Sequence, residues 1–171
     1  MNTDARLIGF LSGASPDGEG RLLDEILTWP DQRLEQVHDF IQWMFPLTEP
    51  SPVNPGAPVL DTAAIAEIRA RPELQANLRR SYQRLRSFYA SSNHWIVPGN
   101  HNHLRITRIL KCLTLLGLEP EAREFFEWLS AIYRQELRKP HPGITARSYE
   151  FWRQAIGVEQ AGSPSPPVGC G

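Results

Sequence analysis

Apolar residues recur at spacings of three, four and seven along most of this 171-residue chain, and this periodicity constrains the fold more than any other feature. Such spacing gathers apolar side chains on one face of an α-helix, whereas a half-buried strand alternates with a period of two. The helical pattern covers residues 21–29, 31–45, 61–70, 72–90, 104–116, 120–137 and 145–157. The sequence therefore predicts an all-α fold, a single-domain bundle of about six to seven helices.

Two stretches of the chain cannot continue a helix. Residues 49–58, EPSPVNPGAP, hold four prolines and a glycine, which predicts a rigid, irregular connector. The last stretch ends in AGSPSPPVGCG and has too little apolar surface to order itself. We expect one helical domain over residues 1–157 and a disordered Ser/Pro/Gly tail over residues 158–171.

The composition excludes several classes of protein. An apolar fraction of 41% and a charged fraction of 22% are typical of a globular chain. No stretch contains the roughly 20 apolar residues that a membrane-spanning helix needs, and MNTDARLIGFLSG lacks the pattern of a secretory signal, so we expect a cytoplasmic protein. Cys112 and Cys170 are the only cysteines, which argues against a disulfide framework or a cysteine-based zinc site. We expect no cofactor.

The net charge of −1 conceals a strong asymmetry along the chain. Residues 1–65 hold three arginines against ten acids, and residues 66–111 hold eight arginines and one lysine against two glutamates. The basic middle could attract phosphates or nucleic acid, or it could pair with the acidic first third across the folded core. We favour internal pairing, and binding of nucleic acid by the arginines of residues 69–108 stays as an alternative.

The stretch NHNHLRITRIL, residues 100–110, places two histidines before a helical pattern. His101 and His103 lie two residues apart, which puts them on different sides of a helix, so joint metal binding would require an extended backbone. Asn100 or Asn102 is a good N-cap, and we interpret NHNH as a capped helix entrance. The alternative is a metal site formed by His94, His101 and His103.

Arg105 and Arg108 lie three residues apart and are therefore neighbours on the surface of the expected helix. Their guanidinium groups could bind a carboxylate or a phosphate of a ligand. The other interpretation, which we favour, is a buried ion pair with an acid of the first third, such as Glu35 or Asp39.

Two residues of the expected helix 31–45 have both a structural and a functional interpretation. His38 and Asp39 resemble the HD signature of metal-dependent phosphohydrolases, but no histidine precedes His38 to complete that site. His38 lies on the apolar stripe, which favours a buried, hydrogen-bonded histidine. Trp43 could be covered by the proline-rich connector or could line a peptide groove, and we favour cover by the connector.

Two long segments resemble one known family. EQVHDFIQWMFPLTEPSPVNPGAPVL resembles the segment H-x-[YF]-I-Q-W-[LM]-F-P-L-x-E-P of the opioid growth factor receptor conserved domain, and HNHLRITRILKCLTLLGLE resembles its second block. The resemblance covers about residues 21–157 and is closest to the short bacterial-type members. It implies a receptor-like regulatory protein, because the animal members are described as intracellular receptors for an enkephalin peptide. It carries over no catalytic residue.

The two blocks suggest one binding site. We expect the polar side chains of His38, Gln42, Asn102, Arg105 and Arg108 to converge beside Trp43 into a pocket for an anionic or peptide carboxylate group.

The first interpretation of the chain is thus a non-catalytic binding or regulatory domain for a peptide, a protein or a small anionic ligand. The alternatives are a metal-dependent enzyme or metal-binding protein that uses the histidine cluster, and a nucleic-acid-binding protein.

Overall fold

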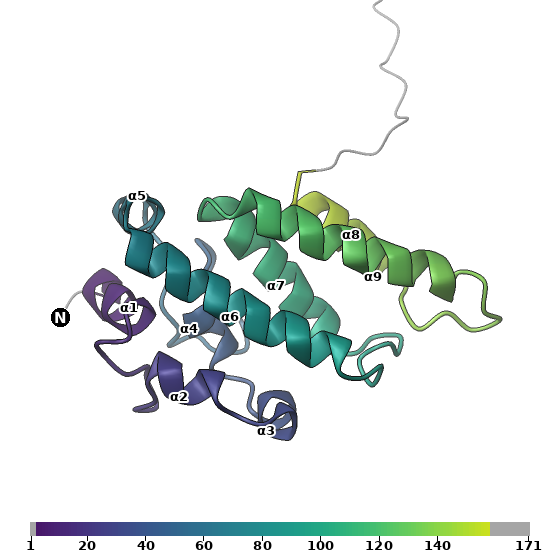
Figure 1. Cartoon of the computed structure of the whole chain (residues 1–171), viewed down its shortest axis with the longest axis horizontal. Coiled ribbons are helices and arrows are strands. Elements are labelled where there is room, and N and C mark those ends of the chain that lie inside the picture. Colours follow the sequence, from purple (N-terminus) through teal and green to yellow (C-terminus); the bar gives the residue numbers. More distant parts are fainter. Residues whose placement is uncertain (1–2, 158–171) are drawn as a thin grey trace, which may run out of the picture.

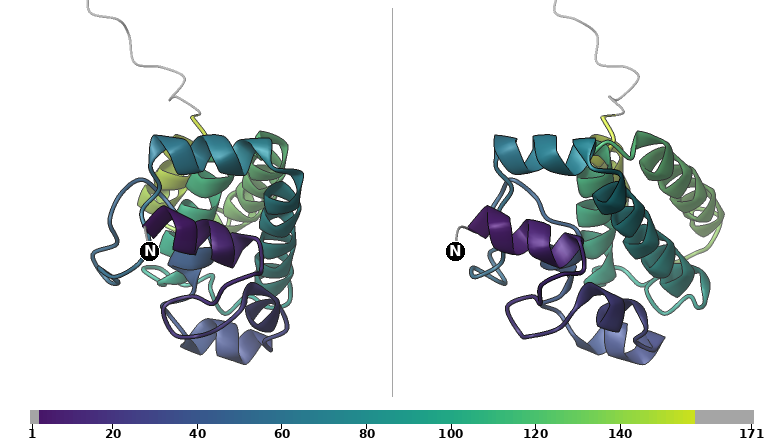
Figure 2. Two further views of the ribbon diagram at one scale, coloured as in Figure 1. Left: turned by 90° about the vertical axis from the view of Figure 1, so that its left-hand side faces the viewer. Right: turned by 60° about the vertical axis from the view of Figure 1, so that its left-hand side comes forward.

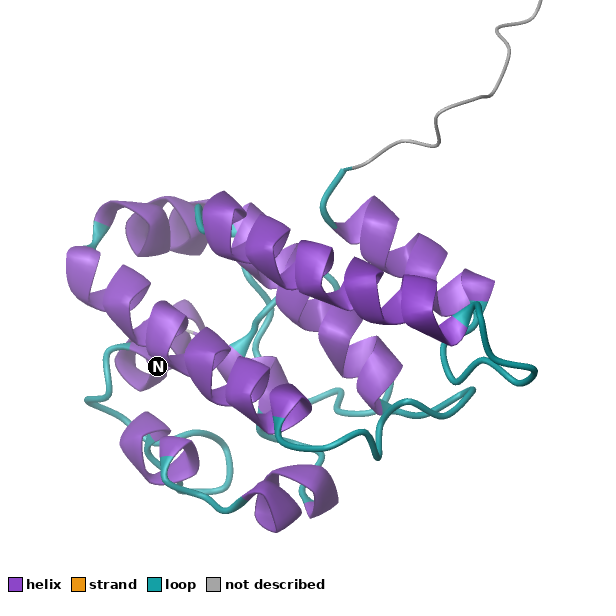
Figure 3. Cartoon of the chain, turned by 45° about the vertical axis from the view of Figure 1, so that its right-hand side comes forward, coloured by secondary structure: helices purple, strands orange, loops and turns teal. Residues whose placement is uncertain are grey.

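The structure, a computed structural model, describes residues 3–157, which contain nine α-helices and no strand (Figure 3). The predicted all-α fold is confirmed, and the predicted tail at residues 158–171 lies outside the described residues. The helices are α1 (Thr3–Leu11), α2 (Leu23–Leu27), α3 (Asp31–Gln36), α4 (Ile41–Met44), α5 (Thr62–Ala70), α6 (Pro72–Ala90), α7 (Asn102–Leu115), α8 (Glu119–Glu136) and α9 (Ala146–Ala155).

Helix α7 lies at the centre of the bundle. It packs most extensively against α8 and α9, and α6 crosses in front of it in Figure 1. Ile106, Ile109, Leu110 and Leu113 of α7 are fully buried, as their helical spacing predicts. The short helices α1 to α4 cover the opposite side of the core, where α1 contacts α4, α5 and α6 (Figure 2). None of the described helices is long and apolar enough to span a membrane.

The predicted helix ends are largely confirmed. Asp61 accepts a hydrogen bond at 2.8 Å from the backbone amide of Ala64 and so caps α5. Pro72 opens α6, where its missing amide costs no hydrogen bond. Gly117 follows the end of α7 with a φ of +89°, a left-handed conformation that glycine adopts without strain.

The single helix predicted over residues 31–45 is wrong. Helix α3 ends at Gln36, Val37 is extended with φ −92° and ψ 131°, and α4 begins only at Ile41. The apolar spacing continues through the break because both short helices bury the same side of the chain, so periodicity alone could not reveal it. A second difference is α1, which the sequence pattern did not predict. These two differences account for nine helices instead of six to seven.

Helix α1 contributes to the burial of Trp43. The ring of Trp43 packs edge-on against Phe10 of α1, with centroids 5.5 Å apart, and Arg6 lies 5.4 Å above it. Only 4% of Trp43 is exposed. The cover of Trp43 therefore includes α1, which the sequence pattern did not predict.

Part of the basic middle of the chain pairs with the acidic first third, as we favoured, and part pairs with α8 instead. Two arginines of α6 pair with the acidic first third and two with α8: Arg80–Asp24 at 2.9 Å, Arg84–Asp31 at 2.6 Å, Arg79–Glu121 at 2.6 Å and Arg86–Glu124 at 3.5 Å. Each such pair is partly exposed and adds little stability. Their common effect is to neutralise α6, which leaves less charge available for phosphates.

Candidate ligand-binding site

A groove of about 510 Å³ runs between the first three turns of α7 and the segment formed by α4 and the start of the proline-rich connector. Four of the six predicted ligand-binding residues line it: His38, Gln42, Arg105 and Arg108. Asn102 and Trp43 do not. The structure thus brings most of the predicted set together. These residues line the groove between α4 and α7, whereas Trp43 packs against α1.

Arg105 explains why the chain breaks between α3 and α4. Its guanidinium donates hydrogen bonds to the carbonyl of Leu34 at 2.8 Å and to that of Val37 at 2.7 Å. These carbonyls stand at the end of α3, where helical partners are missing. Arg108, one turn later, donates at 3.0 Å to the carbonyl of Phe45, the C-cap of α4. Two arginines of α7 therefore cap two helices that are distant in sequence.

Neither Arg105 nor Arg108 forms an ion pair with a carboxylate in the part of the chain that the structure describes. The buried ion pair that we favoured for them is wrong, because Asp39 pairs with Arg21 at 2.8 Å and Glu35 binds other groups. Burial lowers the pKa of both guanidinium groups, since removing a cation from water disfavours its charged form. The α7 wall of the groove is therefore positive, and the exposed Glu49 on the opposite wall, 4.0 Å from Lys111, is the carboxylate that lines the groove within the described residues.

Gln42 is the second unusual group in the groove. Gln42 is only 3% exposed, and its side-chain oxygen has no hydrogen-bond partner among residues 3–157. Buried polar groups almost always have partners, and an orphaned one costs about 1–3 kcal/mol. An unpartnered buried acceptor that lines a groove is typical of a position completed by a ligand.

This cost leads to a prediction for the ligand-free protein. Gln42→Met keeps the length of the side chain and removes the orphaned oxygen, so we expect it to raise the free energy of unfolding by about 1 kcal/mol. Denaturant unfolding of both proteins without ligand measures the difference. A loss of stability of similar size would show that Gln42 has a partner inside the protein.

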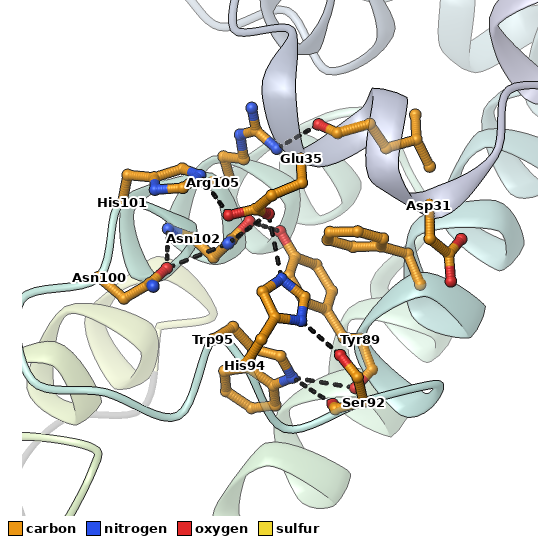
Figure 4. A network of polar contacts seen from close by, with 12 residues as sticks. Asp31, Glu35, Tyr89, Ser92, His94, Trp95, Asn100, His101, Asn102 and Arg105 are labelled. Carbon is orange, nitrogen blue, oxygen red and sulfur yellow. Dashed lines mark hydrogen bonds and ion pairs between the residues drawn. The ribbon is translucent and has the colours of Figure 1, made fainter.

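Figure 4 shows a polar network next to the groove, with Glu35 of α3 at its centre. Glu35 accepts hydrogen bonds from Asn102 at 3.0 Å and from His94 at 3.1 Å, and its other oxygen lies 3.2 Å from His101. Burial acts to raise the pKa of Glu35, but these hydrogen bonds and the charge of the nearby histidines outweigh it and lower the pKa. The network fastens α3 to the start of α7.

Asn102, predicted as a ligand-binding residue, is a fully buried part of this network. Its amide donates to Glu35 and, at 3.0 Å, to Asn100, and its oxygen accepts from the hydroxyl of Tyr89 at 3.2 Å. Asn100 also accepts from the backbone amide of Asn102 at 2.9 Å. The predicted asparagine N-cap is thus corrected: His101 occupies the N-cap position without a side-chain cap bond, and Asn100, one residue earlier, accepts from the first backbone amide of α7.

The three histidines of the alternative metal site do not converge. His94 and His101 both reach Glu35, but His103 points to the other side of α7, where it bonds the carbonyl of Trp95 at 2.9 Å and the hydroxyl of Ser148 at 3.0 Å. Within the described residues, no group of three histidine, cysteine or acidic side chains has a geometry suited to a metal ion.

Ser92, His94 and Glu35 are the residue types of a hydrolytic triad, and Ser92 contacts Nδ1 of His94. In such triads Nε2 faces the serine and Nδ1 faces the acid, whereas here Nε2 faces Glu35. Glu35 is also shared with Asn102 and His101. The geometry favours a structural tie between α3 and the loop before α7.

Two histidines, the buried His103 and the more exposed His101, give the stability a pH dependence. Burial lowers the pKa of His103 from its ordinary value of 6.5, although the carbonyl of Trp95 acts in the opposite direction. Burial also lowers that of His101, which Glu35 partly offsets and Arg105 and His38 reinforce. The unfolded state therefore binds more protons in this range, so we expect the free energy of unfolding to fall as the pH falls below about 6.5.

His103→Gln should make this fall smaller, because Gln cannot take up the proton. Denaturant unfolding of both proteins from pH 8 to pH 5.5 measures the two slopes. A stability that rises on acidification in this range would contradict the histidine geometry. Glu35 adds a separate loss only at lower pH, below its ordinary value of 4.5, because its pKa is lowered in the folded protein.

Most of the other lining residues were not predicted to belong to the site, among them His101 at the start of α7, Leu104 and Lys111 in α7, and Glu49 on the opposite wall. His101, Leu104 and Lys111 share a face of α7 with the two arginines. Counted from His101, Leu104, Arg105, Arg108 and Lys111 follow after three, four, seven and ten residues, which is helical spacing. That stripe was readable in the sequence. The histidine pair was not, because His38, in the break between α3 and α4, and His101, at the start of α7, are distant in sequence although their rings lie 5.0 Å apart.

Comparison with known proteins supports the resemblance found in the sequence. Residues 15–95 match the family described as the opioid growth factor receptor (OGFr) conserved region. The human opioid growth factor receptor is 32% identical over 165 residues, which cover 80% of this chain and 23% of that protein. The mouse receptor is 36% identical over 133 residues, covering 63% of this chain and 21% of that protein.

Mouse opioid growth factor receptor-like protein 1 is 32% identical over 158 residues, covering 81% of this chain and 33% of its own length. The chain thus spans between 21% and 33% of these relatives. No solved structure gives a significant match to this chain.

Proposed function

Because the chain belongs to the opioid growth factor receptor conserved-region family, we propose that it is a non-catalytic binding domain that holds a peptide segment in the groove between α4 and α7. The relatives are named as receptors, and the chain spans less than a third of most of them. For this chain we therefore propose the binding function of a receptor domain.

The observation that carries the proposal is that Gln42 and Arg108 both line this groove. Gln42 offers an orphaned acceptor, and Arg108 offers a half-buried cation without a carboxylate among the described residues. A peptide can satisfy both, because its amide groups donate hydrogen bonds and its carboxylates bind guanidinium groups.

The edges of the groove suit a peptide as well. Leu104 is 70% exposed and Val53 is 83% exposed, and they stand on opposite walls. Exposed apolar side chains beside buried polar groups are typical of a site that an apolar segment covers.

Selection of peptides from a random display library on the immobilised protein tests the proposal. We expect the enriched peptides to lose most of their affinity for Leu104→Glu, which places a charge on the apolar edge of the groove. Because Leu104 is exposed, this change should alter the free energy of unfolding by less than about 0.5 kcal/mol. Arg138→Gln, an exposed change on the far side of the bundle beyond α8, is the matched control. Enriched peptides that bind both variants like the native protein would contradict the proposal.

A further inference from the structure

We propose that the groove selects an extended segment with one acidic side chain, Asp or Glu, between apolar residues, and that Arg108 binds the carboxylate of that side chain. This inference rests on the proposed function and names the chemistry of the ligand. Three properties of the groove lead to it: its charge, its orphaned acceptor and its length.

The charge of the groove calls for an acid. Arg105 is 5% exposed, and both terminal nitrogens of its guanidinium already bind carbonyls of α3 and its C-cap. Arg108 is half-buried, and only one of its nitrogens is engaged, by the carbonyl of Phe45. Lys111 adds a second cation one turn further, and its ammonium lies 4.0 Å from the exposed Glu49. Arg108 therefore has donors left for a carboxylate, and a guanidinium binds one with two parallel hydrogen bonds.

The orphaned acceptor excludes a simple anion. The buried oxygen of Gln42 has no donor within residues 3–157, and phosphate or sulfate at neutral pH would bring mainly further acceptors into the groove. A peptide brings backbone N–H groups together with a carboxylate. A residue with an acidic side chain supplies the N–H for Gln42 and the carboxylate for Arg108.

The length of the groove favours an acidic side chain over a free carboxyl terminus. The lining residues of α7 extend from His101 to Lys111, which corresponds to roughly 15 Å at 1.5 Å per residue. An extended segment of about four or five residues has this length. Arg108 lies inside this stretch, with Leu104 and Lys111 on either side, so a bound chain continues past it in both directions. The apolar neighbours of the acid would then cover Ile41, Leu47 and Leu104.

Three five-residue peptides test the inference by competition in fluorescence polarisation. The first is acetyl-Ala-Leu-Glu-Leu-Ala-amide, the second has Gln in place of Glu, and the third has Gln and a free terminal carboxylate. We expect the Glu peptide to bind the native protein at least about tenfold more tightly than the other two, because one charge-assisted pair in a partly buried site has that magnitude. Arg108→Gln should reduce the affinity for the Glu peptide to that for the Gln peptide.

Matched variants keep this test decisive. Arg108→Lys retains the charge without the two-pronged donor and should give an intermediate affinity, so the experiment does not depend on Arg108→Gln folding well. Arg138→Gln should leave all three affinities unchanged. Equal binding of the Glu and Gln peptides would overturn the inference and leave the proposed function standing. Preference for the free terminal carboxylate would overturn the choice of a side chain. No binding of any peptide at millimolar concentration would overturn the proposed function as well.

Discussion

Replacing Arg105 by Met should lower the free energy of unfolding by about 3 kcal/mol. The change removes the donors of two partly or fully buried carbonyls, those of Leu34 and Val37, and each hydrogen bond to a charged group contributes about 1.5–3 kcal/mol. The relief of the buried charge offsets part of this loss. In a domain of this size the melting temperature should fall by roughly 6–12 °C, which calorimetry or circular dichroism measures.

Arg108→Met is the matched control, because it removes one carbonyl contact instead of two and should cost about 1 kcal/mol. Hydrogen exchange adds a local readout, since the amides of α3 should lose protection in Arg105→Met before those of α8. An unfolding free energy of Arg105→Met within about 0.5 kcal/mol of the native value would show that Arg105 does not hold the break between α3 and α4.

Asn102→Ala should cost a similar amount, about 3 kcal/mol. The side chain is fully buried and joins Glu35, Asn100 and Tyr89, so its loss leaves the hydroxyl of Tyr89 without its acceptor. Burial raises the pKa of Tyr89, which keeps the hydroxyl protonated and in need of a partner. Denaturant unfolding measures the change.

A double-mutant cycle with Tyr89→Phe isolates this contact. Because both single changes remove the same hydrogen bond, the double variant should be destabilised by about 1 kcal/mol less than the sum of the single variants. Strict additivity would mean that Tyr89 and Asn102 do not interact. Unchanged stability of Asn102→Ala would remove Asn102 from the network and return it to the set of possible ligand-binding residues.

The sequence predicted those features of the fold that depend on local chemistry. The cap at Asp61, the opening proline Pro72 and the closing glycine Gly117 each act through neighbouring backbone groups, and all three lie where their residue types prefer to lie. The all-α class followed from the periodicity of the apolar residues for the same reason.

Features that depend on contacts between distant segments were not predictable in this way. The break after Gln36 depends on Arg105, which is 69 residues later in the chain, and the cover of Trp43 depends on α1. The spacing of Leu7, Phe10 and Leu11, all buried, was that of a helix, but the stretch is short and its partner was unknown.

The candidate site shows the same division. Arg105 and Arg108 of α7 and His38 and Gln42 before and in α4 were identified from their types and spacing. Tertiary contacts decide that Arg105 is engaged by carbonyls while Arg108 has donors left. Tertiary contacts also decide that Asn102 is buried and does not line the groove.

The central claim is that Arg108 faces a ligand in the groove while Arg105 holds the end of α3. NMR spectra that resolve the guanidinium N–H groups and the methyl groups, recorded while the Glu peptide is added, test this claim most directly. We predict progressive shifts for Arg108 and for the methyl groups of Ile41, Leu47 and Leu104, with Arg105 nearly unchanged. Shifts confined to residues outside the groove, such as those of α8, would contradict the claim.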